Sequence, residues 1–155
     1  YSHYFFQGLV AEIGNMKGFK TFIPAQDKNK PFAKQKLGEV ASISKLFEFT
    51  YPEILRKAQT IDVVWFNDRK YPSSFFEIEH STDITNSLIK FVELQDFRTN
   101  FYIVADLRRR AEFDSKIALN AFKPIKPFIN FWDYDSVLDF HTKATASKLA
   151  EQALL

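Results

Sequence analysis

Cysteine is absent from the 155 residues of the chain, which excludes disulfide bonds and thiolate chemistry. The absence fits a reducing compartment. No basic segment followed by an apolar one stands at the start of the chain, as an export signal would require. Long apolar runs are also missing: Ile61–Phe66 is closed by polar residues and falls far short of the roughly 18 residues that span a bilayer. We therefore expect a soluble, cytoplasmic protein.

Charge of one sign is not in excess either, because 21 lysines and arginines against 19 acidic residues leave a net charge of +2. This balance excludes a histone-like polycation. A basic rim beside an acidic pocket would suit a site that holds a polyanion and a cation together, whereas a run of lysines can also be a solvated surface. The basic run is Lys17, Lys20, Lys28, Lys30, Lys34 and Lys36, and the later acids are Glu77, Glu79, Asp83, Glu93 and Asp96.

The composition is that of a globular protein, with 46% hydrophobic and 26% charged residues. The length predicts a single domain over residues 1–155. Aromatic residues are abundant, and 18 phenylalanines predict an unusually aromatic core. Because the first residue is Tyr1 and not methionine, we expect the chain to be a processed product or a fragment of a longer one.

Hydrophobic periodicity predicts alternating helices and strands. The stretch 26–36 is expected to be an exposed loop, and 37–49 a strand or an irregular segment. The expected helices are 4–13, 52–58, 84–96, 108–120 and 135–154, and the expected strands are 20–25, 61–66, 75–80, 100–105 and 128–132. The second and third strands form a hairpin. The order predicts an α/β fold in which helices flank a mixed sheet.

Two carboxylates stand where an apolar strand is expected. In the run 75–80, a period of two places Glu77 and Glu79 on one face together with Phe75. Two unpaired carboxylates in a central strand would cost several kcal/mol each unless protons, arginines or a metal ion neutralise them. Asp62 opens the preceding strand, fifteen residues before Glu77, so a hairpin brings all three acids to one end of neighbouring strands.

Oxygen ligands of this kind select hard cations, Mg²⁺ or Mn²⁺. Glu12 lies at the border of the apolar face of the first helix, three residues after Leu9, and can point inward as a fourth acid. The alternative interpretation is structural: Glu77 or Glu79 pairs with a lysine or arginine of a neighbouring element, and Asp62 only caps a strand.

At these residues the sequence resembles the PD-(D/E)xK nucleases, the restriction-endonuclease-like superfamily. The resemblance rests on an Asp at a strand start, then Glu-x-Glu on the next strand with a helix behind it, within 61–65 and 76–82. The predicted element order also matches the αβββαβ core of that superfamily. The resemblance covers about residues 4–105, and a further strand and helix follow at 128–154.

The resemblance implies that Asp62 and Glu77 are metal ligands and that Glu12 is the acid of the first helix that often completes the site. Glu79 stands where the superfamily usually has lysine, although some restriction enzymes carry glutamate there. Lys90 on the following helix could supply the missing charge, but the helical period places it about 120° from the apolar stripe, so it reaches only from the flank. Gln95, in that stripe, could orient a ligand or be a satisfied core residue.

Such a site hydrolyses a phosphodiester bond, with Mg²⁺ or Mn²⁺ activating a water molecule. Glu79 would act as an extra ligand or as the general base, and His80 faces the other way unless the strand is irregular, so a buried or capping His80 is the preferred interpretation. Several cations could contact phosphates: Lys28, Lys30, Lys34, Lys36, Arg108, Arg109 and Arg110. The three arginines open a helix, where positive charge opposes the helix dipole.

Two functions remain open from the sequence. The first is a Mg²⁺-dependent nuclease acting on DNA in restriction or defence, possible as a homodimer and with a recognition domain outside the chain. The second is a nuclease fold that has lost cleavage and binds nucleic acid or a protein partner, which Glu79 at the lysine position favours. A glycosidase is disfavoured, because two acids on one strand face point the same way and cannot flank a bond.

Overall fold

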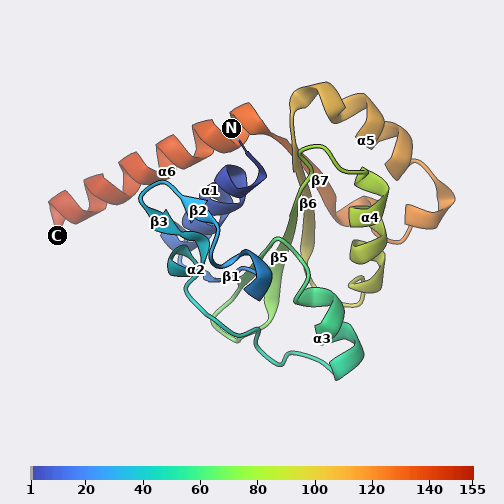
Figure 1. Ribbon diagram of the computed structural model, residues 1–155, viewed down its shortest axis with the longest axis horizontal. Helices are drawn as coiled ribbons and strands as arrows, with labels where there is room; N and C mark the ends of the chain where they lie inside the picture. The colour runs from blue at the N-terminus through green and yellow to red at the C-terminus, as the bar shows by residue number, and fades with distance from the viewer. Residues whose placement is uncertain (1) are drawn as a thin grey trace.

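A five-stranded mixed sheet forms the centre of the protein in a computed structural model that describes residues 2–155 (Figure 1). In spatial order the strands are β1 (Lys20–Phe22), β4 (Val63–Phe66), β5 (Pro72–Ile78), β6 (Asn100–Ala105) and β7 (Ile129–Asp133). Strand β4 is antiparallel to both β1 and β5, whereas β6 runs parallel to β5 and β7 parallel to β6. The predicted α/β class with a mixed sheet is confirmed.

The central strand β5 is hydrogen-bonded on both sides, which fixes the position of its acidic end. On one side Val63 of β4 lies opposite Phe76, and on the other Glu77 is in register with Ile103 of β6. Because β4 and β5 are antiparallel, the first residues of β4 and the last residues of β5 lie side by side at the same end of the two strands. Asp62 therefore arrives beside Glu77, as the predicted hairpin requires.

Helices cover both faces of the sheet (Figure 1). One face carries α1 (His3–Met16) and α6 (Tyr134–Leu154), and the other carries α3 (Pro52–Ala58), α4 (Ile84–Glu93) and α5 (Arg110–Ile117). Asp83 caps α4, since its side chain accepts a hydrogen bond from Thr85 N. Within residues 2–155, no helix combines the length and the apolar character needed to cross a membrane.

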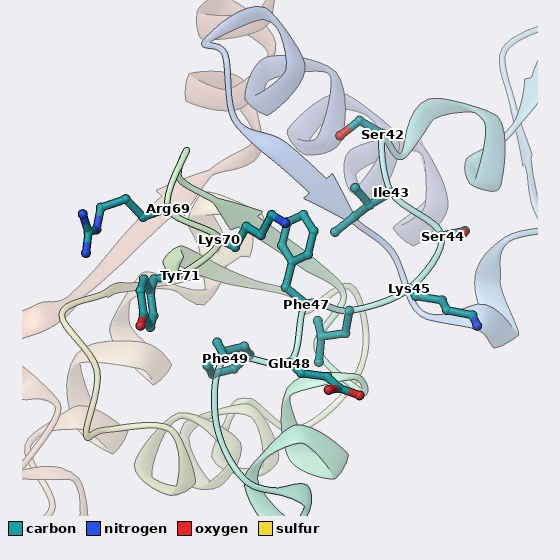
Figure 2. Close-up of a pocket in the computed structure, with 11 residues that line it drawn as sticks. Ser42, Ile43, Ser44, Lys45, Phe47, Glu48, Phe49, Arg69, Lys70 and Tyr71 are labelled. Carbon is teal, nitrogen blue, oxygen red and sulfur yellow. The ribbon is translucent and has the colours of Figure 1, made fainter.

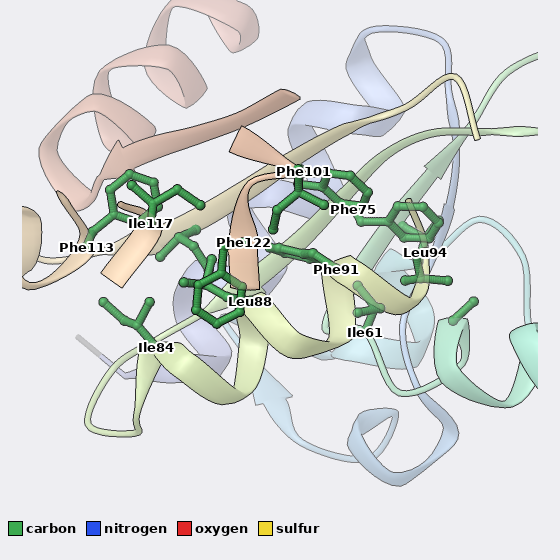
Figure 3. Close-up of a cluster of buried hydrophobic side chains, with 14 of the residues drawn as sticks. Ile61, Phe75, Ile84, Leu88, Phe91, Leu94, Phe101, Phe113, Ile117 and Phe122 are labelled. Atoms are coloured by element: carbon green, nitrogen blue, oxygen red, sulfur yellow. The ribbon is translucent and has the colours of Figure 1, made fainter. Parts of the chain in front are cut away.

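Each face of the sheet has its own hydrophobic core. Phe75 points toward α4 and belongs to the same core as Leu88 and Phe91 of α4 and Phe101 of β6 (Figure 3). The alternate residues Phe76 and Ile78 belong to the second core, under α1 and α6. The period of two predicted for this strand is therefore confirmed, and Glu77 lies on the α4 side of the sheet.

The segment between β1 and α3 differs most from the prediction. The stretch 26–36 is not simply an exposed loop, because it forms a short hairpin of β2 (Pro31–Phe32) and β3 (Gln35–Lys36) after the 3₁₀ turn η1 (Ala25–Asp27). The Phe32 ring is buried against Gly8 of α1, a contact that a Cβ atom on residue 8 would block. This packing against α1, which a periodicity analysis cannot see, orders the hairpin.

Two further segments differ in detail. The stretch 37–49 contains the short helix α2 (Leu37–Val40) and is otherwise irregular. The helix expected at 108–120 is divided into the 3₁₀ turn η2 (Leu107–Arg109), α5, and the 3₁₀ turn η3 (Asn120–Phe122), and a last 3₁₀ turn, η4 (Lys126–Phe128), precedes β7.

Candidate functional site

Asp62, Glu77 and Glu79 lie together at the end of the sheet where β4 begins and β5 ends. We call these three residues the acidic cluster. Asp62 and Glu77 hold each other through backbone groups. Glu77 Oε2 accepts a hydrogen bond from Asp62 N at 2.9 Å, and Asp62 Oδ2 accepts one from Ile78 N at 2.8 Å. These reciprocal bonds fix both carboxylates relative to the strands.

Ser87 of α4 links the two glutamates. Its buried hydroxyl lies 3.1 Å from Glu77 Oε1 and also contacts Glu79 Oε1, while Thr82 donates to the other oxygen of Glu79. A hydroxyl carries one proton and can donate to only one carboxylate at a time. With both glutamates ionised, one of them would face the Ser87 hydroxyl without receiving its hydrogen bond, which favours a proton on one carboxyl group.

Lys90, one turn further along α4, approaches the cluster from the flank, as its position on the helix predicted. Its Nζ atom lies 2.9 Å from Glu77 Oε1 and 3.3 Å from the carbonyl oxygen of Thr60. The Lys90 side chain is 35% exposed and that of Glu77 only 4%. The ammonium group thus lies between solvent and the buried carboxylate.

Burial determines the protonation of this cluster. Burial, followed by the negative charge of Asp62, raises the pKa of Glu77 to about 8, against the opposing effect of the Lys90 ammonium. Burial also raises the pKa of Glu79, although hydrogen bonds from Ser87 and Thr82 oppose this. Burial lowers the pKa of Lys90, but the charges of Glu77, Asp62 and Glu79 outweigh it and raise the pKa overall. Near neutral pH the cluster therefore favours a proton on Glu77, in spite of the ammonium group beside it.

Helix α1 contributes His3 and Gln7, four residues apart on one helix face, and sequence reasoning missed both. His3 Nε2 lies 3.2 Å from Asp62 Oδ2. The fully buried Gln7 donates from Nε2 to Asp27 Oδ2 at 3.0 Å and to the carbonyl oxygen of Asp62 at 2.8 Å. Gln7 Oε1 is buried without a hydrogen-bond partner. The available signal was a glutamine inside an apolar helix, where a polar group needs a partner.

Glu12 does not join the cluster, which corrects the prediction that it completes the site. Its Oε1 atom lies 2.9 Å from His141 Nε2 of α6. Glu12 lies five residues after Gln7, which is about 140° around the helix, so it faces α6 while Gln7 faces Asp62. Glu12 therefore links α1 to α6 through His141.

Arg109 is engaged within the protein, whereas the prediction that Arg108 and Arg110 contact phosphates stays open, because their side chains are 88% and 54% exposed. Arg109 donates to the carbonyl oxygens of Glu79 and Thr82 and pairs with Glu112 at 2.9 Å, so its donors are engaged in holding the turn after β5. Arg108 pairs with Asp106 and Arg110 with Asp114, each at 3.1 Å. The acidic partners offset the charge that opposes the helix dipole.

The lysines of the β2–β3 region are exposed, which leaves their prediction as phosphate contacts open. They are Lys28, Lys30, Lys34 and Lys36, and Lys30 Nζ lies 5.3 Å from the centre of the Tyr4 ring. Gln95 lies beyond the end of α4, is exposed, and donates from its side chain to Val92 O, so it does not belong to the core, and its role in orienting a ligand stays a prediction. His80 is exposed and bonds to the Tyr134 hydroxyl at 3.1 Å, so it is not buried.

Within the part of the chain that the structure describes, no group of three or more histidine, cysteine, aspartate or glutamate side chains is arranged to hold a metal ion. The acids predicted as ligands are instead engaged with hydrogen-bond donors. Glu77 contacts Lys90, Ser87 and the backbone of Asp62. The carboxylates of Asp62 and Glu77 still lie side by side, as two oxygen ligands that a metal ion could use instead of three.

Comparison with known proteins identifies a family that matches almost the whole chain. The family of the type II restriction enzyme NmeDI C-terminal domain matches residues 1–154. The chain therefore belongs to this family, and the sheet, the helices on its two faces and the acidic edge described above are features of a member of it.

One curated relative is the type II restriction enzyme NmeDI of Neisseria meningitidis serogroup C. It is 24% identical to this chain over 162 residues, and the match covers 98% of the chain and 46% of the relative. The chain thus spans about half the length of the relative that it matches. No solved structure matches the chain.

Proposed function

We propose that the chain is a Mg²⁺-dependent nuclease domain of the PD-(D/E)xK type that cleaves DNA in a restriction system. The observation that carries the proposal is the meeting of Asp62 and Glu77 at the adjoining ends of β4 and β5, with Lys90 2.9 Å from Glu77. The order of helix, three antiparallel strands, helix and parallel strand agrees with the αβββαβ core of that superfamily. Membership in a restriction enzyme family agrees with DNA as the substrate.

The donor set of the cluster fits Mg²⁺. This ion usually binds proteins through one or two carboxylates and completes its shell with water and substrate phosphate, so a group of three protein ligands is not required. Asp62 and Glu77 supply two hard oxygen donors. The raised pKa of Glu77, caused first by burial and then by the charge of Asp62, indicates a site where an added cation would be favourable.

The reaction would be a hydrolysis of the phosphodiester bond. Mg²⁺, when bound, would lower the pKa of a water molecule and neutralise charge on the phosphate. Lys90 would take the part of the motif lysine, placing a positive charge beside the phosphate that is attacked. Glu79, held by Ser87 and Thr82, would orient the attacking water and accept its proton. His3 and Gln7 would keep Asp62 in position from the side of α1.

A second candidate function is a nuclease fold without cleavage that serves another part of a longer protein. The contacts of Glu77 favour it, because both oxygens are engaged by protein donors and Lys90 forms an ion pair with it. It corresponds to the alternative that the sequence leaves open, in which Glu77 pairs with a lysine of a neighbouring element. The two functions differ in a single measurable property, which is cleavage of DNA in the presence of Mg²⁺.

Plasmid cleavage separates the two functions. The wild-type chain is expected to nick or linearise supercoiled plasmid with Mg²⁺ or Mn²⁺ and to leave it intact in EDTA. Lys90→Met is expected to slow cleavage about tenfold to a hundredfold, because a charge beside the phosphate is lost. Linear product without a nicked intermediate would indicate that two copies cut together.

The matched control is Lys57→Met, which removes an exposed lysine of α3. It should cleave at the wild-type rate. A wild-type chain that binds plasmid but leaves it intact with either metal would refute the nuclease and support the second function.

A further inference from the structure

The turn between β4 and β5 presents basic residues at the opposite end of the hairpin from the acidic cluster. Its shape is fixed by Asn67, whose Oδ1 atom accepts hydrogen bonds from Arg69 N at 2.9 Å and Tyr71 N at 3.1 Å. Lys70 has a φ of 66°, in the left-handed region where glycine is the favoured residue. Lys70 thus occupies a backbone position that glycine would adopt more easily. The Lys70 side chain is exposed at the surface.

Most cations at this end of the molecule have no acidic partner. We use the name turn patch for Lys45, Arg69, Lys70, Tyr71 and Arg98. Among residues 2–155, the ion pairs within 4.0 Å include none of its four cations. The run Arg108–Arg110 differs, since each arginine there pairs with an acid. The acids near the turn patch are Glu48, Asp68 and Asp96, so its four cations still exceed the nearby acids by one.

Two cavities flank the turn and share residues of the turn patch. The larger, of about 760 Å³, lies between the segment 42–49 and the turn, and Lys70 reaches across it to the Phe47 ring at 5.6 Å (Figure 2). The smaller, of about 350 Å³, is lined by Arg69, Tyr71 and Arg98. Arg98 comes from the loop before β6, so two guanidinium groups from separate segments border one small cavity.

A third cavity adjoins the larger one at Lys45. It has a volume of about 680 Å³ and shares Ser44, Lys45, Leu46 and Glu48 with the larger one. Its other end is lined by Thr60, whose carbonyl oxygen accepts the hydrogen bond from Lys90. The linings of the two cavities therefore overlap around Lys45, and the lining of the third cavity also includes Thr60, the hydrogen-bond partner of Lys90.

We infer that the turn patch binds the phosphate backbone of duplex DNA beside the point of cleavage. The inference rests on the proposed function, because it takes DNA as the substrate. Arginine and lysine without acidic partners release counterions when they meet phosphates, and the Tyr71 side chain, 50% exposed, offers a further donor. The strand β5 has seven residues and is about 20 Å long, which separates the two sites by roughly six base pairs of B-DNA.

The turn patch fits a polymer better than a free anion. Its cations spread over the turn and two further segments, those of Lys45 and Arg98, and line open cavities that adjoin each other. A single phosphate would engage only the smaller cavity. Inorganic phosphate is therefore an arm of the test: it should compete only weakly with DNA.

The test measures DNA binding without cleavage. The full 155-residue chain is titrated into a short fluorescein-labelled duplex in EDTA, at NaCl concentrations from about 50 to 200 mM, and fluorescence anisotropy is recorded. The double variant Arg69→Ala/Arg98→Ala should bind about tenfold more weakly, and the slope of log K against log salt should fall by about two. Lys70→Gly should also weaken binding while its melting temperature stays equal to the wild type or rises, because the left-handed residue is relieved.

The charge-matched control is Lys143→Ala/Lys148→Ala on α6, on the other side of the sheet, which should bind like wild type. Wild-type affinity in both patch variants would overturn the inference, and so would a wild-type chain that binds no duplex or loses it to millimolar phosphate. The nuclease proposal fails on a different result: a chain that binds duplex through the turn patch but does not cleave it with Mg²⁺ supports this inference and refutes that proposal.

Discussion

Glu77→Gln is expected to reduce Mg²⁺-dependent cleavage by about a thousandfold or more, the largest effect of any single substitution considered. The amide has nearly the same volume as the carboxylate but no charge, so the ligand is lost while the shape of the strand end is kept. Asp62 N can still donate to the amide oxygen. The rate of plasmid nicking with Mg²⁺ measures the effect, and duplex binding in EDTA shows whether the DNA surface is intact.

Glu12→Gln is the control for this substitution. It makes the same chemical change on α1, where Glu12 meets His141 and not the acidic cluster. Cleavage by Glu12→Gln should match wild type. If Glu77→Gln cleaves at the wild-type rate, Glu77 is not a metal ligand and the assignment of the site is wrong.

The stability of the metal-free protein is expected to fall as the pH rises from about 5 to 8, by about 1–3 kcal/mol. Burial, then the charge of Asp62, raises the pKa of Glu77 from 4.5 in the unfolded chain to about 8. Between these values the folded state binds more protons than the unfolded state. By linkage, the extra stability is fully present below the pKa of the unfolded chain. It is lost as the pH rises through the pKa of the folded chain.

Two groups near Glu77, Glu79 and His3, also make the free energy of unfolding fall as the pH rises. The pKa of Glu79 is raised by burial. That of His3 is lowered by burial but raised overall by its hydrogen bond to Asp62 and by nearby carboxylates. Glu77→Gln should therefore reduce the slope without removing it, and should be more stable than wild type at pH 8.

Urea unfolding at several pH values, in EDTA, measures this slope. Glu12→Gln should keep the wild-type slope, and added Mg²⁺ should flatten it, because the cation replaces the proton. Wild-type stability that rises between pH 5 and 8, or an unchanged slope in Glu77→Gln, would contradict the raised pKa.

The hairpin and its acids could be predicted because their signals are local. Glu77 and Glu79 interrupt an otherwise apolar run, and the turn residues between the two strands set the pairing that brings Asp62 to them. Lys90 could be placed on the flank of α4 from the helical period alone. Each of these predictions needs only the geometry of one strand pair or one helix.

The contribution of α1 could not be predicted in the same way. Eight of its residues are buried, because the sheet, α6 and the β2–β3 hairpin surround it. Periodicity identifies a buried face but does not say which neighbour each side of that face meets. The buried face therefore predicts that Glu12 joins the cluster, whereas in the structure Gln7 and His3 occupy that side and Glu12 faces His141.

The ion pairs of the arginines at the start of α5 follow a pattern that is visible in the sequence. Arg109 and Glu112 are three residues apart and Arg110 and Asp114 four, which are the spacings of ion pairs on a helix. The turn patch, in contrast, joins residues from three separate segments, and only the folded chain brings them together.

Binding of Mn²⁺ to the wild-type chain and to Asp62→Asn, followed by electron paramagnetic resonance, tests most directly whether the acidic edge of the sheet is a metal site. The account predicts saturable binding by wild type, tighter as the pH rises toward 8 and Glu77 loses its proton, and loss of that binding in Asp62→Asn. No saturable Mn²⁺ binding by wild type, or equal binding by Asp62→Asn, would contradict it.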